Sequence, residues 1–143
     1  MKVKDIMTKQ TVIGTPSKTV LLAANKMAQK GVGALIIAGK NLPLGIITER
    51  DIVRKVVAMK KDPNTTKISE IMSEPLFTTS PNNDIREAAK IMSINEVRRL
   101  PVVENGKLVG ILTATDIAKS LVGQLTGQDA LLYAITRYHK YGY

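Results

Sequence analysis

The chain contains no cysteine and a single histidine, His139. Without cysteine it can form neither a disulfide bond nor a thiolate nucleophile, and thiolate metal sites are excluded. One histidine is too few for a zinc cluster or a catalytic histidine arrangement. The phosphate-cradling motif Gly-x-x-x-x-Gly-Lys-Ser/Thr is also missing. We therefore expect neither an enzyme nor a metalloprotein.

Aromatic residues and long apolar runs are scarce as well. The aromatics are one phenylalanine and four tyrosines, and the tyrosines all fall within residues 133–143, so the core must be built from aliphatic residues and methionine. No apolar run approaches the length of a membrane span. The opening MKVKDIM lacks the apolar segment of a secretory signal. These absences predict a soluble cytoplasmic protein with no membrane partner.

Positive charge is unevenly distributed. The net charge is +9, and residues 1–65 carry twelve Lys/Arg against four Asp/Glu, which leaves +8 in the first half. A basic half indicates an anionic partner, such as a nucleotide, a nucleic acid or an acidic protein. The lysines are dispersed along the segment, however, so most of them are expected only to keep the surface soluble.

The most informative pattern is a segment that occurs twice. Residues 45–52 read GIITERDI, and residues 110–117, 65 positions later, read GILTATDI. At this offset residues 4–56 align with residues 69–121 without a gap, and thirteen positions are identical. Chance does not hold one offset over such a span, so the chain contains two copies of one supersecondary unit.

Each copy predicts the same succession of elements. An apolar turn, Ile6-Met7 or Ile71-Met72, precedes a brief extended piece at 11–13 or 76–78, and a proline and a helix follow. Apolar residues at helical spacing mark that helix. They are Val20, Ala23, Ala24 and Met27 in the first copy, and Ile85, Ala88, Ala89 and Met92 in the second.

Two strands and a closing helix complete each copy. The strands are expected at 34–38, 44–48, 100–103 and 108–113, and the closing helices near Glu49 and Ala114. Asn105-Gly106 predicts a tight hairpin because both residues tolerate positive φ, whereas residues 40–43 predict a looser connection. Asp84 and Glu87 predict a capping box at the first helix of the second copy.

The domain organisation follows from the repeat. The turn-rich segment KKDPNT at 60–65 separates residues 1–62 from residues 63–123, and residues 124–143 form a C-terminal helical tail. Neither unit buries enough surface alone, so the two are expected to pack sheet to sheet around one shared core with the helices outside. The predicted fold class is α/β (α+β): two tandem β-α-β-β-α repeats with pseudo-twofold symmetry.

This pattern resembles the CBS domain pair, a family named after cystathionine β-synthase, over residues 1 to about 122. The motifs are the Asp/Glu-Ile-Met opening, a proline followed by Ala-Ala-x-x-Met, the strand RRLPVV, and Gly-h-h-Thr-x-x-Asp-Ile, where h is an aliphatic residue. Each motif is weak alone, but all of them recur in order. The residues matched are CBS repeat 1 at 1–62 and CBS repeat 2 at 63–123.

The resemblance implies a stand-alone regulatory module with two clefts between its sheets. Such clefts bind AMP, ADP or ATP as regulatory ligands, and in some members S-adenosylmethionine. Two modules usually pair through their helices, so a homodimer and an unidentified protein effector are implied. The implied function is sensing of energy or metabolite state, with no required cofactor.

The Thr-x-x-Asp segments admit two interpretations. Thr48 with Asp51, and Thr113 with Asp116, have the spacing of a helix capping box. The resemblance instead assigns them to a nucleotide: the carboxylate accepts the ribose hydroxyls, while the threonine and helix N-terminal amides hold a phosphate. Both roles can operate in one protein.

Arg98 and Arg99 are the main asymmetry between the copies, because the first copy has Gly33 and Ala34 there. Arginine suits phosphate because its planar fork donates two parallel hydrogen bonds. By analogy with related pairs, Arg98, with Arg99, would meet the phosphates of a ligand held on Asp51. The alternative is a surface charge pair with Glu96 or Glu104.

Further contacts are implied around both clefts. Arg50 lies beside the Asp51 cleft, which should therefore prefer a phosphorylated adenosine, while the Asp116 cleft should take a less negative ligand. Adenine needs an apolar slot, although core packing explains the same residues equally well. The candidates are Val12, Ile13 and Ile36 for one cleft, and Phe77, Thr78 and Pro101 for the other.

The tail provides a rival hypothesis. Residues 129–141 can form a helix whose tyrosines and basic residues either pack on the module or contact nucleic acid. A nucleic-acid-binding protein that uses the basic first half and this tail is therefore the alternative to a nucleotide or S-adenosylmethionine sensor.

Overall fold

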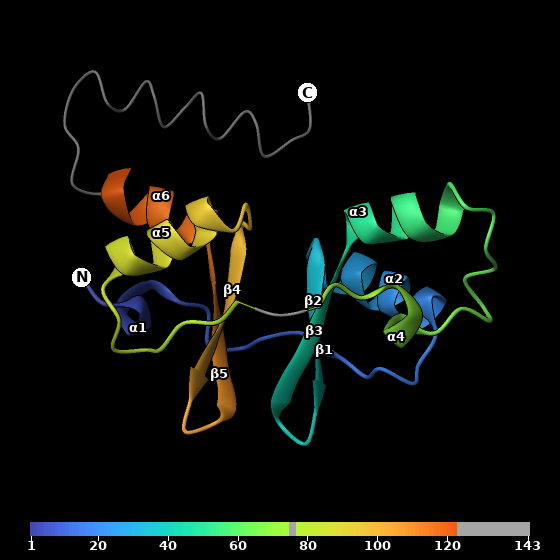
Figure 1. Cartoon of the computed structure of the whole chain (residues 1–143), viewed down its shortest axis with the longest axis horizontal. Helices are drawn as coiled ribbons and strands as arrows, with labels where there is room; N and C mark the ends of the chain where they lie inside the picture. The colour runs from blue at the N-terminus through green and yellow to red at the C-terminus, as the bar shows by residue number, and fades with distance from the viewer. Residues whose placement is uncertain (75–76, 123–143) are drawn as a thin grey trace.

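The computed structural model describes residues 1–74 and 77–122 (Figure 1). The helix expected at 129–141 lies outside these residues. Both copies contain helices and short strands in the predicted order, except that the first strand expected in the second copy is a single bridge at Thr79. The elements of the first copy are α1 (Val3–Ile6), β1 (Ile13–Gly14), α2 (Val20–Lys30), β2 (Ala34–Gly39), β3 (Leu42–Thr48), α3 (Glu49–Ile52) and the π-helix η1 (Val53–Val57). Those of the second are α4 (Ile68–Ile71), α5 (Ile85–Ile94), β4 (Arg99–Glu104), β5 (Lys107–Thr113) and α6 (Ala114–Val122).

Two small sheets lie at the centre of the molecule, and the helices lie on their outer sides (Figure 1). In the first sheet β1 runs parallel to β2, and β2 is antiparallel to β3. In the second, β4 is antiparallel to β5, and Thr79 forms a parallel bridge with Val102 where the first copy has β1. The sheets meet through β3 and β5. This arrangement confirms the predicted fold class. No helix in the described residues is long and apolar enough to cross a bilayer.

The hydrophobic residues form two cores, so the expectation of a single shared core was wrong. One cluster joins α2 to the helix-facing side of β2 and β3, including Val20, Leu35 and Ile47. The other joins α5 to β4 and β5, including Ala88 and Leu100. Each core lies between a sheet and its own helices, because alternate strand residues point away from the other sheet.

Each core is completed by a helix from the other copy. Val3 of α1 is fully buried in the second core, and its backbone amide donates to the Asn83 carbonyl at 2.9 Å. Ile68 and Ile71 of α4 are buried in the first core, and the Ile68 amide donates to the Lys18 carbonyl at 2.9 Å. The two copies are therefore interlocked, and neither core is complete without residues from the other half.

Both hairpins turn on two residues in the left-handed region. Asn105 and Gly106 have φ of 51° and 75°, as their sequence predicts. Lys40 and Asn41 have φ of 51° and 64°, so β2 and β3 are joined as tightly as β4 and β5. The expected looser connection at 40–43 was wrong, because strand pairing imposes a backbone conformation that Lys40 does not favour by itself.

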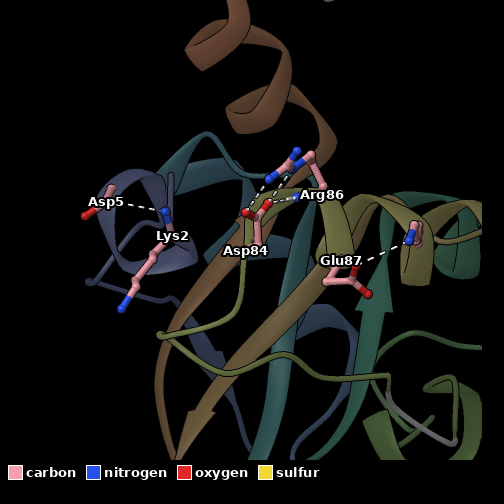
Figure 2. Close-up of polar contacts among 6 residues, drawn as sticks. Lys2, Asp5, Asp84, Arg86 and Glu87 are labelled. Carbon is pink, nitrogen blue, oxygen red and sulfur yellow. Dashed lines mark hydrogen bonds and ion pairs between the residues drawn. The ribbon is translucent and has the colours of Figure 1, made fainter.

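The capping box expected at α5 forms only in part (Figure 2). Asp84 caps the helix by accepting from the Arg86 amide at 2.8 Å, and it also pairs with the Arg86 guanidinium at 3.1 Å. Hydrogen bonding from the Arg86 side chain lowers the pKa of Asp84 to about 2. Glu87 does not return a bond to the cap but pairs with Lys90 at 3.3 Å, so its predicted role was wrong.

The interlock predicts a large cost for truncating Ile68. Ile68→Ala should lower the free energy of unfolding by about 2–5 kcal/mol, because it opens a cavity in a core that lies mostly in the other copy. Urea denaturation measures this, with Ser69→Ala, at an exposed position of the same helix, as the control. Equal stability of the two variants would contradict the packing described here.

Candidate functional site

The two Thr-x-x-Asp segments adopt the same geometry at the starts of α3 and α6. Asp51 Oδ2 accepts from the Thr48 amide at 2.9 Å and from its hydroxyl at 3.0 Å. Asp116 Oδ2 accepts from the Thr113 amide at 2.9 Å and from its hydroxyl at 2.8 Å. In both, the threonine Oγ1 accepts from the aspartate amide at 3.1 Å. The capping interpretation is confirmed, and it uses one carboxylate oxygen in each copy.

The other carboxylate oxygen distinguishes the copies. Asp51 is 9% exposed, and its Oδ1 lies 3.1 Å from the Lys55 ammonium and accepts from the Ser73 hydroxyl at 3.3 Å. Lys55 also donates to the Ile71 carbonyl at 3.0 Å, at the last residue of α4. The Asp51 carboxylate is therefore tied both to η1 and to the segment that follows α4.

Asp116 has a simpler environment. Its positional equivalent of Lys55 is Ser120, whose hydroxyl donates to the Ile117 carbonyl at 2.7 Å. The equivalent of Ser73 is Thr8, which meets Ile111 through backbone bonds. Within residues 1–74 and 77–122, Asp116 Oδ1 accepts no hydrogen bond, and the residue is partly exposed.

Arg99 reaches from the second copy toward the first. A Cβ built on Gly33 would lie 3.2 Å from the Arg99 Nη2 and 3.6 Å from the Glu49 carboxyl carbon, so both side chains line this glycine. Burial lowers the pKa of Arg99, opposed by the Glu49 charge, and Arg98 lowers it further. The absence of a side chain at Gly33 leaves room for this guanidinium near the start of α3.

Arg98 and Arg50 are exposed. Arg98 contributes its backbone carbonyl, which accepts from the Ala114 amide at 2.9 Å at the start of α6. In the described part of the chain neither Arg98 nor Arg99 forms an ion pair with Glu96 or Glu104. The alternative of a surface charge pair with these glutamates is therefore not observed.

The candidate adenine residues differ in exposure. Ile36 and Pro101 are buried but belong to neither helix-facing core, as strand alternation requires for residues on the opposite sheet faces. Phe77 is 38% exposed, and Thr78 is exposed.

Val12 and Ile13 line an open groove of about 420 Å³. Lys26 and Lys30 of α2 also line it, and the Lys26 ammonium donates to the Ile13 carbonyl. Ile36 pairs with Ile13 across the parallel strands. The structure therefore brings Ile13 and Ile36 together on neighbouring strands, whereas the Val12 side chain packs against the first core.

Two glycines allow the crossing segments to pass close to the sheets. A Cβ on Gly45 would lie 2.8 Å from the Met72 sulfur and 3.2 Å from the Ser73 carbonyl oxygen. A Cβ on Gly110 would lie 2.8 Å from the Thr8 carbonyl oxygen and 2.9 Å from the Met7 sulfur. The identity of these glycines at the 65-residue offset was the signal for this contact.

Sequence reasoning missed three residues around Asp51. They are Lys55, Ser73 and Glu49. The spacing of four between Asp51 and Lys55 is a helical ion-pair signal that could have revealed one of them. Ser73 and Glu49 carry no such local signal, because their positions depend on the interlock and on the approach of Arg99.

The close crossing at Gly110 predicts a steric cost. Gly110→Ala should lower the free energy of unfolding by about 1–3 kcal/mol, because a backbone oxygen and a methionine must move. Gly106→Asn is the control, since this position is open and has a positive φ that asparagine tolerates. Thermal denaturation compares them; an unchanged melting temperature for Gly110→Ala would contradict the crossing.

Comparison with known proteins places both copies in one family. The CBS domain model matches residues 3–58 and 68–123. The protein MK0525 of Methanopyrus kandleri is 40% identical over 82% of this chain, which spans 61% of that relative's length. The CBS domain-containing protein YhcV of Bacillus subtilis is 36% identical over 90% of this chain and 89% of its own.

A solved structure agrees with these matches. The CBS domain pair of protein MJ0100, in complex with 5′-methylthioadenosine and S-adenosyl-L-methionine, superposes with a TM-score of 0.79 at 28% identity, covering 87% of this chain and 98% of that one. The two segments matched by the CBS domain model coincide with the two copies, and each contains its Thr-x-x-Asp helix start. The chain therefore belongs to the CBS domain family and contains two copies of the domain.

Proposed function

We propose that this protein is a cytoplasmic regulatory module that binds an adenosine-containing ligand and transmits its presence to a protein effector. AMP, ADP and ATP are the preferred candidates. The observation that carries the proposal is the pair of aspartates presented identically at two helix starts, each capped through only one carboxylate oxygen. The complex of MJ0100 with two adenosine compounds supports the ligand class.

Each aspartate has the chemistry to hold a ribose. A carboxylate accepts about four hydrogen bonds in all, and the threonine cap uses two of them. The two remaining positions suit the 2′ and 3′ hydroxyls, which lie on adjacent carbons and both donate. On Asp116 no described residue occupies them, whereas on Asp51 they are occupied by Lys55 and Ser73, which the ligand would have to replace. A nucleoside can thus bind without breaking the cap, and the same residue then serves folding and recognition.

The adenine would lie against apolar side chains that face away from the helix-lined cores. Ile36 with Ile13 serves one cleft, where Val12 would contribute only its backbone because its side chain packs against the first core. Pro101 with Phe77 and Thr78 serves the other. Backbone groups of the short edge segments can meet the polar edge of the base. An apolar slot with a few polar groups is typical of nucleoside sites.

The first cleft would take a phosphorylated adenosine. Arg99 comes from the second copy to the start of α3, where Arg50 and Lys55 add positive charge and Glu49 only partly offsets it. A partly buried guanidinium binds phosphate through charge-assisted bonds that water screens weakly. The Asp116 cleft would accept a ligand with less negative charge.

Self-association through the helices would complete the module. Val53, Val57 and Met59, on or just after η1, are 58%, 67% and 65% exposed. Exposed apolar residues grouped on one helical segment indicate a surface that another protein covers. We propose that a second copy of the module covers it, and that the effector responds to the resulting homodimer.

The aspartates give the first test. Asp51→Ala should weaken AMP or ATP binding by about 30-fold or more, because two hydrogen bonds to the ribose are lost. Isothermal titration calorimetry with AMP, ADP, ATP, S-adenosylmethionine and adenosine measures this at two salt concentrations. Asp116→Ala is the matched variant and should remove a second, separate binding event.

Other outcomes distinguish the alternatives. Binding of Asp51→Ala that equals the parent would reduce Thr48 and Asp51 to helix caps. If none of the five ligands produces heat, while DNA or RNA binds with an affinity that falls steeply with salt, the nucleic-acid hypothesis takes its place. Nucleotide binding through two capped sites should depend on salt much less.

The arginine pair gives a second test. Arg99→Ala should weaken AMP binding by about tenfold or more and adenosine binding by less than about threefold, since only the phosphate loses a partner. Arg98→Ala, at the exposed neighbour, is the matched control and should change either affinity by less than about threefold. A larger effect at Arg98 would restore the original sequence-based preference for that residue.

A further inference from the structure

The Asp51 carboxylate has all of its acceptor positions in use. Its Oδ2 accepts from the Thr48 amide and hydroxyl, at 2.9 and 3.0 Å. Its Oδ1 lies 3.1 Å from the Lys55 ammonium and 3.3 Å from the Ser73 hydroxyl. Two donors on each oxygen is the usual capacity of a carboxylate. A ribose diol donates two hydrogen bonds, so it cannot bind Asp51 through both unless the Lys55 ammonium leaves and the Ser73 hydroxyl turns away.

The donor whose departure can distinguish between ligands is Lys55. Its side chain is 46% exposed and sits on a flexible stem. The Thr48 donors cannot leave without opening the start of α3. The Ser73 backbone exchanges two bonds with Ile46 and stays in place, but its neutral hydroxyl can turn away from Asp51 at the same cost for every ligand. Among these donors Lys55 is also the only cation, so its departure changes the charge balance.

Resting on the proposed function, we propose that Lys55 competes with the ligand for Asp51 and thereby makes the first cleft selective for phosphorylated adenosines. When the ribose hydroxyls take the Oδ1 position, the ammonium loses its anionic partner. A ligand phosphate provides a new one within the same cleft, whereas uncharged adenosine provides none. The energetic cost of displacing Lys55 therefore falls mainly on ligands without phosphate.

The second copy has no competing lysine at the equivalent position. Position 120, equivalent to Lys55, is a serine whose hydroxyl bonds within α6. In the described part of the chain Asp116 Oδ1 accepts no bond and needs no donor to leave. The two clefts would thus differ in ligand preference through one lysine as well as through Arg99, and this lysine acts on the ribose-binding group itself.

The test uses the full chain with Asp116→Ala, so that only binding to the first cleft is measured. Adenosine and AMP are titrated calorimetrically into this parent and into three derivatives: Lys55→Met, Lys55→Arg and Arg54→Met. Lys55→Met keeps the apolar stem and removes the charge. Lys55→Arg keeps the charge. Arg54→Met removes an adjacent exposed charge, which controls for the general loss of positive potential.

The expected result is a change in selectivity. Lys55→Met should bind adenosine about three- to tenfold more tightly, since the competing ion pair is gone, and AMP no more tightly than the parent. The ratio of AMP to adenosine affinity should then fall by about three- to tenfold. Lys55→Arg and Arg54→Met should keep that ratio within about twofold of the parent value.

The failure of this inference can be told apart from failure of the proposed function. If Asp51→Ala in the same background loses AMP binding but Lys55→Met leaves the ratio unchanged, the lysine does not compete and only this inference is overturned. An equal fall in the ratio for Arg54→Met would also overturn it, because general electrostatics would then explain the effect. If AMP does not bind, or Asp51→Ala binds it as the parent does, the proposed function fails and this inference with it.

Discussion

The interlock of the two copies is the constraint on which the rest of the structure depends. Each sheet and its helices leave a core open at one end, and a four-residue helix from the other copy closes it with Val3 or with Ile68 and Ile71. The chain that leaves each short helix must then cross the opposite sheet. It does so over Gly45 and Gly110, where only the absence of a side chain permits the approach. The same crossing carries Ser73 to Asp51, so the candidate site follows from the way the cores are closed.

Capping and recognition share one side chain in each copy. The threonine engages one aspartate oxygen and holds the helix start, which leaves the other oxygen for a different partner. In the first copy Lys55 and Ser73 take that position, and in the second copy serine and threonine at the equivalent positions bond elsewhere. A duplicated motif thus acquires two different environments through neighbours that the repeat did not preserve. Arg99, which has no counterpart at Ala34, increases this difference.

Much of the fold could be predicted from the sequence because local signals agree with the final structure. The strands and the starts of α3 and α6 follow from apolar patterning and from Thr-x-x-Asp, and the Asn105-Gly106 turn follows from residues that accept positive φ. The turn at Lys40-Asn41 could not be predicted, because pairing of β2 with β3 outweighs the preference of lysine. Glu87 was misassigned because its carboxylate pairs with Lys90, one turn along, and does not return to the Asp84 amide.

The site was harder to predict for a reason that lies in the symmetry of the sequence. Ile6-Met7 and Ile71-Met72 are identical, so nothing local indicates which core each segment joins, and Ser73 could not be assigned to Asp51. Arg98 lies exposed in the bend before β4, whereas Arg99 is the first residue of β4 and lies against Gly33. To predict which of the two arginines reaches the first cleft, one must know how the two sheets are oriented relative to each other. That orientation depends on contacts between residues far apart in the chain.

The exchange of the short helices also orders events during synthesis. Residues 1–8 are made long before their partners, because the sheet that buries Val3 is not complete until residue 113 has been made. The first core, in contrast, needs nothing beyond Ile71 and can close while the second copy is still being translated. Contacts between such distant residues form slowly because a long loop must be closed first. The segment that carries Val3 must therefore remain unpaired until the second sheet has been made, and it docks after the first core can already have closed.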